Sequence, residues 1–309
     1  MLIKWVTELF EILDDPNVNG DTVAVYLRSI YSAAQTSVKR LHSEKGYTDV
    51  ISITIPGTDK NAPTTGIIGQ LGALGARPEI IGFVSDGDGA LCALTVAAKL
   101  LSMKAKGDNL TGRVTIATSI CPNAGTTPHE PVPFIDPPVS IYEINKEQVT
   151  SEMSVIFSVD ATKGNKITNA RGFAISPVVK SGYILPPSDS LLELMSTTTG
   201  GLPRVVPLSQ YDITPYESGF RHINSIISPN IFTDAPVVGV ALTAQSVVAG
   251  SAPCANHFTD IEEAARFLLE AAKMSGNRKL SLYDEIMYQH AVNAYGNLNH
   301  FQKMPPVIK

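Results

Sequence analysis

The stretch SDGDGALCALTVAAKLLSMKAKGDNLTGRVTIATSI, residues 85–120, decides the fold class of this chain. Apolar side chains recur at helical spacing from Gly89 to Lys106, and the β-branched run 112–120 that follows is typical of a strand. The run EIIGFV, residues 79–84, comes directly before the stretch and also has a strand-like pattern. Strand, helix and strand in this order predict a βαβ unit with parallel strands.

Similar β-branched runs, bounded by glycine and proline, continue on both sides of this unit. Continuous apolar character of this kind favours strands that are covered on both faces. We therefore predict a three-layer α/β/α fold with a mixed, mostly parallel sheet. The expected strands cover residues 50–55, 66–70, 79–84, 112–120, 154–160, 172–177 and 235–242.

Helical patterns dominate the two ends of the chain. A first helix is expected from Ile3 to Leu13, and Asp21 could cap a second helix that runs as far as His42. The sequence thus predicts a single α/β domain over residues 1–309 with an N-terminal helical segment over about residues 1–45. Further helices are expected over residues 189–195, 260–274 and 280–299.

Composition limits the classes of partner. Of the 309 residues, 44% are hydrophobic, which suits a sizeable core, and the net charge of −5 is spread without a run of lysine or arginine. We therefore expect no nucleic acid and no membrane as partner, but a small molecule or short peptide. The N-terminus is unlike a signal peptide because acids interrupt its apolar stretch. Three widely spaced cysteines predict free thiols and a cytoplasmic location.

Polar side chains gather where the predicted strands end, and loops and helix N-termini converge at such ends in α/β folds. Asp86 and Asp88 follow one strand, Asp160 ends another, and His257 lies in a loop of small residues after the last strand. Aspartates at a helix start are also explained as caps that interact favourably with the helix dipole. Two carboxylates and an imidazole nevertheless form a plausible ligand set for zinc or manganese. The sequence leaves both interpretations open.

Other motifs of the chain are VSDGDGA (84–90), ICPNAG (120–125), PHEPVPF (128–134), DATKGN (160–165) and RGFAISPVVK (171–180). Together they resemble a bacterial and archaeal family of unknown function, domain of unknown function 1177. Their order also resembles the zinc-dependent exopeptidases of the phosphorylase/hydrolase-like fold, especially the tetrahedral aminopeptidases. That resemblance implies the same fold, with Asp86 as a metal-bridging aspartate, Asp160 as a later carboxylate ligand and His257 as the terminal ligand. It also makes a homo-oligomer an expectation.

The chain departs from the aminopeptidase pattern at two places. Gln70-Leu71-Gly72 stands where the His-x-Asp motif belongs, and Cys121-Pro122-Asn123 stands where a Glu-Glu pair belongs. These replacements remove a metal ligand and the general base that activates metal-bound water. A standard two-zinc peptidase site cannot be built from these residues. The site therefore holds one metal in a changed shell, works without metal, or is not catalytic.

The remaining candidates lie in the same loops. Asp88, Asn123 and His129 are predicted to orient water or substrate. Four further residues are predicted to bind substrate, namely Gln70, Cys121, Asp212 and His222. Cys121 has three interpretations, as a small buried residue, as a thiolate ligand of zinc, and as a nucleophile with His129 or His222 as its base. His129 could equally be a loop histidine bonded to backbone carbonyls, and His222 could equally be a half-buried strand histidine.

The sequence thus predicts a metal-assisted hydrolase of amide bonds, peptides or small amino-acid derivatives, with a degenerate zinc-aminopeptidase-like site. The divalent metal would be zinc or manganese. The alternative is a non-catalytic descendant of the same fold that binds a small molecule or a protein in the old cleft.

Overall fold

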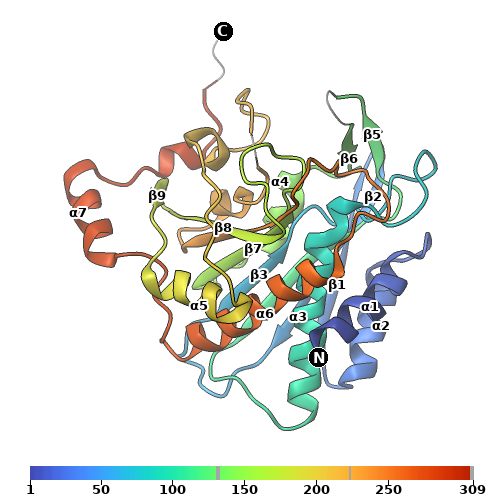
Figure 1. The fold of residues 1–309 in the computed structure, drawn as a ribbon, viewed down its shortest axis with the longest axis horizontal. Coiled ribbons are helices and arrows are strands. Elements are labelled where there is room, and N and C mark those ends of the chain that lie inside the picture. Colours follow the sequence, from blue (N-terminus) through green and yellow to red (C-terminus); the bar gives the residue numbers. More distant parts are fainter. Residues whose placement is uncertain (130–132, 223, 307–309) are drawn as a thin grey trace.

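An eight-stranded mixed sheet forms the centre of the protein (Figure 1), as a computed structural model shows for residues 1–129, 133–222 and 224–306. The strand order is β1-β2-β4-β3-β7-β10-β8-β9. Pairing is parallel from β4 to β10 and antiparallel at both flanks, so that six of the eight strands point the same way. The strands are β1 (Gln35–Ser43), β2 (Gly46–Ile55), β3 (Thr65–Gly69), β4 (Val114–Ile120), β7 (Val155–Ala161), β8 (Gly172–Lys180), β9 (Tyr183–Leu185) and β10 (Val237–Thr243).

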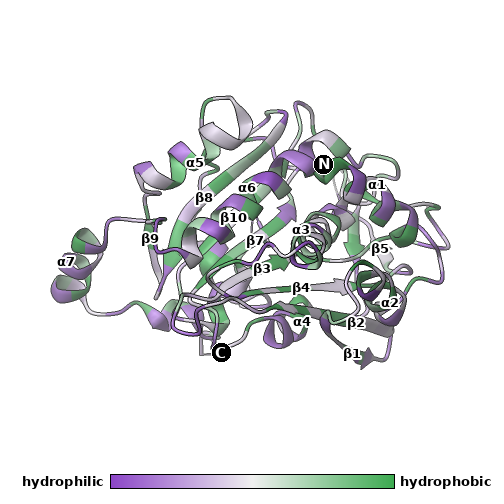
Figure 2. Ribbon diagram, turned by 90° about the horizontal axis from the view of Figure 1, so that it is seen from below, coloured by the Kyte–Doolittle hydropathy of each residue, from purple (hydrophilic) through white to green (hydrophobic). Residues whose placement is uncertain are grey.

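Helices cover both faces of this sheet (Figure 2). One face carries α1 (Leu2–Leu13), α2 (Gly20–Ile30), α3 (Asp88–Ala105), α5 (Asp189–Thr199) and α6 (Phe258–Gly276). The other face carries α4 (Ile141–Gln148) and the short helices η2 (Gln210–Ile213) and η3 (Ser228–Phe232). A hairpin of β5 (Gly125–Thr127) and β6 (Phe134–Asp136) rises beside the sheet, and α7 (Glu285–Tyr295) projects away from it, before η4 (Asn299–Gln302) (Figure 1). The predicted three-layer α/β/α fold is confirmed.

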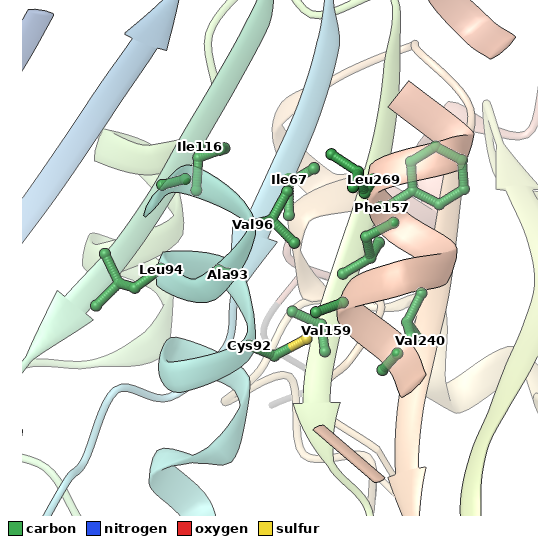
Figure 3. Close-up of a cluster of buried hydrophobic side chains, with 14 of the residues drawn as sticks. Ile67, Cys92, Ala93, Leu94, Val96, Ile116, Phe157, Val159, Val240 and Leu269 are labelled. Carbon is green, nitrogen blue, oxygen red and sulfur yellow. The ribbon is translucent and has the colours of Figure 1, made fainter. Parts of the chain in front are cut away.

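Successive side chains of the central strands point to opposite faces of the sheet and form a hydrophobic core on each face. Ile67, Phe157 and Val240 point to the face of α3 and α6, where they pack with Val96 and Leu269 (Figure 3). Their neighbours Ile68, Ile156 and Ala241 belong to the cluster on the opposite face. Burying each large apolar side chain contributes roughly 1.5–3 kcal/mol. Continuous apolar runs therefore mark strands that are covered on both faces, as predicted.

Two element predictions are wrong. The second helix ends at Ile30, and residues 35–43 form the edge strand β1, which is antiparallel to β2. The N-terminal helical segment is therefore shorter than predicted, and the cap of α2 is Asn19, whose side chain accepts from the Thr22 N–H at 3.0 Å. Residues 79–84 form a loop rather than a strand, because β3 already has β4 and β7 on its two sides.

The cysteines and the lengths of the helices bear on two expectations from the sequence. Cys92, Cys121 and Cys254 are all free thiols, and the first two are buried. Within the described ranges, every helix is too short or too polar to cross a bilayer. Of the PHEPVPF motif, residues 130–132 lie outside the described residues.

Candidate functional site

The carboxyl ends of β3, β4 and β7 form one edge of the sheet, and the start of α3 crosses this edge. Two glycines permit the crossing. A Cβ on Gly89 would lie 2.5 Å from the carbonyl oxygen of Val159, and a Cβ on Gly69 would lie 2.6 Å from the carbonyl oxygen of Gly89. Side chains at these positions would push the helix off the strand ends. The short helix η1 (Ser85–Gly87) and the first turn of α3 are thereby brought to the end of β7.

Asp88 and Lys163 form an ion pair inside this edge. Their side chains are 0% and 2% exposed, and the Lys163 ammonium donates to Oδ2 of Asp88. The ammonium also donates to the carbonyl oxygen of Ala255 at 2.6 Å, while the Asn256 amide donates to Oδ1 of Asp88 at 2.5 Å. Burial raises the pKa of Asp88, against the opposing effect of Lys163 and Asn256. Since both of its oxygens are engaged, Asp88 anchors Lys163.

Asp86 precedes this pair and keeps part of its surface exposed. Its backbone N–H donates to the carbonyl oxygen of Gly250 at 2.9 Å. A Cβ on Gly250 would lie 2.3 Å from both carboxylate oxygens of Asp86, so the carboxylate rests directly against that glycine. Burial raises the pKa of Asp86 to about 8, with repulsion from Asp160 and Asp88 adding to the rise and Lys163 opposing it.

Asp160, at the end of β7, is 3% exposed. Its Oδ2 accepts a hydrogen bond from the Ser225 hydroxyl, whereas its Oδ1 is buried and has no hydrogen-bond partner among the described residues. Burial raises the pKa of Asp160 to about 7, and the hydrogen bond from Ser225 works against this rise. Burial and the charge of Asp160 also raise the pKa of the Tyr216 phenol. Asp160 therefore has half of its acceptor capacity unused.

Two other buried side-chain oxygens at this edge resemble Oδ1 of Asp160. The side-chain Oγ of Ser85 and Oδ1 of Asn256 have no hydrogen-bond partner within the described part of the chain. A buried acceptor without a donor destabilises a protein by about 1–3 kcal/mol. Together with two carboxylates whose pKa values are raised, these atoms define a site rich in acceptors and short of positive charge. A bound cation or a donor group of a ligand would satisfy it.

His257, the predicted third metal ligand, is placed differently. It lies at the N-cap of α6 with a side chain that is 44% exposed, and its Nδ1 is 3.8 Å from Oδ2 of Asp260. In the described residues, no group of three or more His, Cys, Asp or Glu side chains is arranged to hold a metal ion. Asp86 and Asp160 are close enough for their charges to interact. The three-residue ligand set with His257 stays a prediction.

Gln70 and Cys121 are both buried at strand ends. The Gln70 amide donates to Oδ1 of Asn145 at 2.9 Å and to Oγ of Ser158 at 3.2 Å, in a polar network under α4. Cys121 is 3% exposed, and burial raises the pKa of its thiol. A raised pKa favours the thiol over the reactive thiolate at neutral pH. Both residues have contacts that stabilise the edge of the sheet.

The other predicted residues lie in the surrounding loops. Asp212 is buried in η2, where it accepts from the N–H and the hydroxyl of Ser209, both at 2.7 Å. The Nε2 of His222 is 2.8 Å from the carbonyl oxygen of Thr214, and its ring stacks on that of Tyr216. His129 and Asn123 lie near the β5–β6 hairpin. The ring of His129 stacks on Phe134 with centroids 3.8 Å apart, and Asn123 is exposed.

Lys163, Asn256 and Ser225 are the site residues that sequence reasoning missed. A signal exists for Lys163, because it follows Asp160 by three residues in the DATKGN motif on the same loop. Asn256 directly precedes His257 in the loop that the sequence selects. Ser225 has no local signal, since a tertiary contact alone brings it to Asp160.

Comparisons with known proteins agree with this architecture. A family model described as "Protein of unknown function (DUF1177)" matches residues 39–305. No protein of curated function matches the chain.

Solved structures share the fold at low identity. Bottromycin maturation enzyme BotP superimposes with a TM-score of 0.52 at 12% identity, over 87% of this chain and 70% of that one. Cytosol aminopeptidase from Coxiella burnetii gives 0.51 at 13% identity, over 86% and 68%. Leucine aminopeptidase from Caenorhabditis elegans gives 0.54 at 11% identity, over 89% and 66%. The chain therefore spans about two thirds of the length of these structures, and the likeness concerns the fold.

Proposed function

Because the chain belongs to the DUF1177 family, whose function is unknown, and has an aminopeptidase-like fold, we propose a function from its own site. We propose that it is a cation-assisted hydrolase acting on the amide bond of a short peptide or a small amino-acid derivative. Asp86 and Asp160 hold a single divalent cation, and water or substrate completes its shell. The names of two structural neighbours, both aminopeptidases, support this substrate class.

The observation that carries the proposal is the buried Oδ1 of Asp160. It has no hydrogen-bond partner among the described residues, while Ser225 fixes the other oxygen of the same carboxylate. A cation against Oδ1 would compensate this acceptor and relieve the repulsion between Asp160 and Asp86. The atoms offered are carboxylate oxygens, which suit hard cations that keep several waters. The donor set therefore fits manganese or magnesium better than zinc, which favours nitrogen and sulfur.

The chemistry divides between the cation and the protein. When bound, the cation supplies polarisation of the amide carbonyl and a lower pKa for its water. The protein orients Asp160 through Ser225 and holds Lys163 through Asp88. An ammonium has three donors, and Asp88 and Ala255 accept from Lys163. The third donor is assigned to the oxygen that becomes negative during attack, where a fixed positive charge stabilises the transition state.

Titration calorimetry with Mn²⁺ tests the cation, and hydrolysis of aminoacyl p-nitroanilides and dipeptides tests the reaction. We expect one Mn²⁺ per chain and Mn²⁺-dependent hydrolysis in the native protein. Asp160→Asn should lower Mn²⁺ affinity by at least roughly 10-fold and abolish hydrolysis, since a ligand charge is lost. Asp108→Asn is the matched control, because Asp108 is exposed at the end of α3. Absence of Mn²⁺ binding at millimolar concentration would overturn the proposal.

A second candidate is a non-catalytic protein that binds a small molecule at the same edge. One observation favours it: both oxygens of Asp88, which is predicted to orient water or substrate, are engaged by Lys163 and Asn256. Stoichiometric Mn²⁺ binding without hydrolysis of any amide in the panel would support this second function over the first.

A further inference from the structure

We propose that the Lys163 ammonium occupies the position of a second cation at the strand-end edge, so that Lys163→Ala binds one divalent cation more than the native protein does. This inference deepens the proposed function, on which the first cation position rests. The second position is the place beside Asp88 that the ammonium now fills.

The charges at the edge support this inference. Asp86, Asp88 and Asp160 bring three carboxylates to one buried region, and Lys163 brings one ammonium. A buried carboxylate without compensation is strongly destabilising, so each anion needs a positive partner. One ammonium compensates Asp88, and one divalent cation compensates Asp86 and Asp160. Removing the ammonium leaves Asp88 in need of a new cation.

The surroundings of the ammonium are those of a hard cation. Lys163 contacts the carboxylate of Asp88 and the carbonyl oxygen of Ala255, and both are oxygen ligands of the kind that divalent cations take. Asn256, whose amide donates to the same Asp88 carboxylate, has a buried Oδ1 without a hydrogen-bond partner among the described residues. A cation beside Asp88 would compensate this oxygen, which the protein leaves without a donor in its described part.

The loop that carries Lys163 is held independently of its ammonium. The N–H of Thr162 donates to the carbonyl oxygen of Leu242 at 2.8 Å, and the N–H of Val248 donates to the carbonyl oxygen of Lys163 at 3.0 Å. These bonds fix the backbone on both sides against the end of β10 and the loop that follows. Truncation of Lys163 should therefore vacate the ammonium position while the oxygens around it stay in place.

The experiment measures bound Mn²⁺ per chain by equilibrium dialysis and elemental analysis, and the midpoint of thermal unfolding as Mn²⁺ is added. Native protein, Lys163→Ala and Asp88→Asn/Lys163→Ala are compared. We expect bound Mn²⁺ to double in Lys163→Ala and its unfolding midpoint to rise more steeply with Mn²⁺, because ligands that bind the folded state stabilise it. The double variant removes the carboxylate together with the ammonium and should return to one Mn²⁺.

The outcomes separate this inference from the proposed function. If the native protein binds no Mn²⁺ but Lys163→Ala binds one, the proposed function fails and the inference stands. If both bind one, with the same dependence of the unfolding midpoint on Mn²⁺, the inference is overturned and the proposed function stands. Failure of Lys163→Ala to fold at any Mn²⁺ concentration also overturns the inference, since a cation should then replace the ammonium.

Discussion

Asp49 and Asp160 are both buried carboxylates on the same sheet, and they have opposite surroundings. Asp49, on β2, is 1% exposed and accepts from Nε and Nη2 of Arg40 at 2.7 and 2.9 Å and from the N–H of Gly20 at 2.9 Å. Asp160 accepts from the Ser225 hydroxyl and leaves Oδ1 without a partner among the described residues. Burial acts to raise the pKa of Asp49, but Arg40 and Gly20 outweigh it and the pKa is lowered. For Asp160 burial prevails, and the pKa rises to about 7.

The difference shows that the supply of partners, rather than burial, decides what a buried carboxylate does. Asp49 is fully compensated within the protein and ties β1 and the start of α2 to β2. Asp160 is left short of one donor at the edge where loops converge. An uncompensated buried group of this kind marks a candidate ligand site. The two aspartates therefore make opposite predictions for substitution and for pH.

Asp160→Asn should give the largest change in stability, and the change should be a gain. A carboxyl group whose pKa rises from 3.8 in the unfolded chain to about 7 in the folded protein makes stability fall as pH rises between those values. At pH 8 without divalent cations, removing this charge should increase the free energy of unfolding by about 4 kcal/mol. Urea denaturation at pH 5 and pH 8 measures it.

Asp160→Asn should also reduce the fall in the free energy of unfolding between pH 5 and pH 8, because its amide is neutral at both pH values. Asp108→Asn should leave the pH dependence of stability as it is in the native protein. A loss of stability in Asp160→Asn at pH 8 would contradict the view that this carboxylate is uncompensated.

Arg40→Met should have a smaller effect of the opposite sign. It leaves Asp49 buried with the Gly20 N–H as its one hydrogen-bond donor among the described residues. The free energy of unfolding at pH 7 should fall by about 1–2 kcal/mol, since the Arg40 side chain is 42% exposed and screened. In the native protein the lowered pKa of Asp49 contributes stability above pH 4, which is lost as pH falls through the folded value.

Without Arg40 the contribution of Asp49 should reverse and make stability fall as pH rises, as it does for Asp160. Lys39→Met, which removes the exposed pair with Glu147, is the control and should leave the pH profile in place. An unchanged profile in Arg40→Met would show that Arg40 is not what lowers the pKa of Asp49.

Local patterns explain which parts of the fold could be predicted. The central strands and α3 follow from apolar runs and helical periodicity, because tertiary contacts there reinforce local preference. Residues 35–43 could not be assigned from sequence, since their amphipathic pattern fits a helix and only pairing with β2 makes them a strand. The run 79–84 is strand-like, yet β4 and β7 already occupy both sides of β3, and Val84 forms an isolated bridge with Pro253.

The site was predictable to the extent that topology determines it. Parallel strands end at one edge, so the sequence alone indicates that Asp86 and Asp160 approach each other. Side-chain direction in loops is not contained in such a rule, and His257 lies against Asp260 instead. Lys163 was missed because lysine is almost never fully buried, and its burial depends on the carboxylate of Asp88 in another element.

Ser225→Ala should produce the smallest and most specific change, because it removes the side-chain hydroxyl that donates to Asp160. That hydrogen bond opposes the effect of burial, so the pKa of Asp160 should rise further above about 7. Carboxyl ¹³C NMR titration of the cation-free protein measures this shift, and Ser246→Ala, at an exposed serine, is the control.

Ser225→Ala also tests whether the pKa values of Asp49 and Asp160 are set by different partners. Asp49 keeps its partners in Ser225→Ala, so its lowered pKa should not move, and Mn²⁺ affinity should fall because Asp160 loses the contact that orients Oδ1. If the pKa of Asp160 stays near 7, burial and the neighbouring carboxylates set it without help from Ser225. That result would contradict the orienting role proposed for the Ser225 hydroxyl. It would also enlarge the difference between the two aspartates, since Asp49 has effective donors and Asp160 would have no effective side-chain donor.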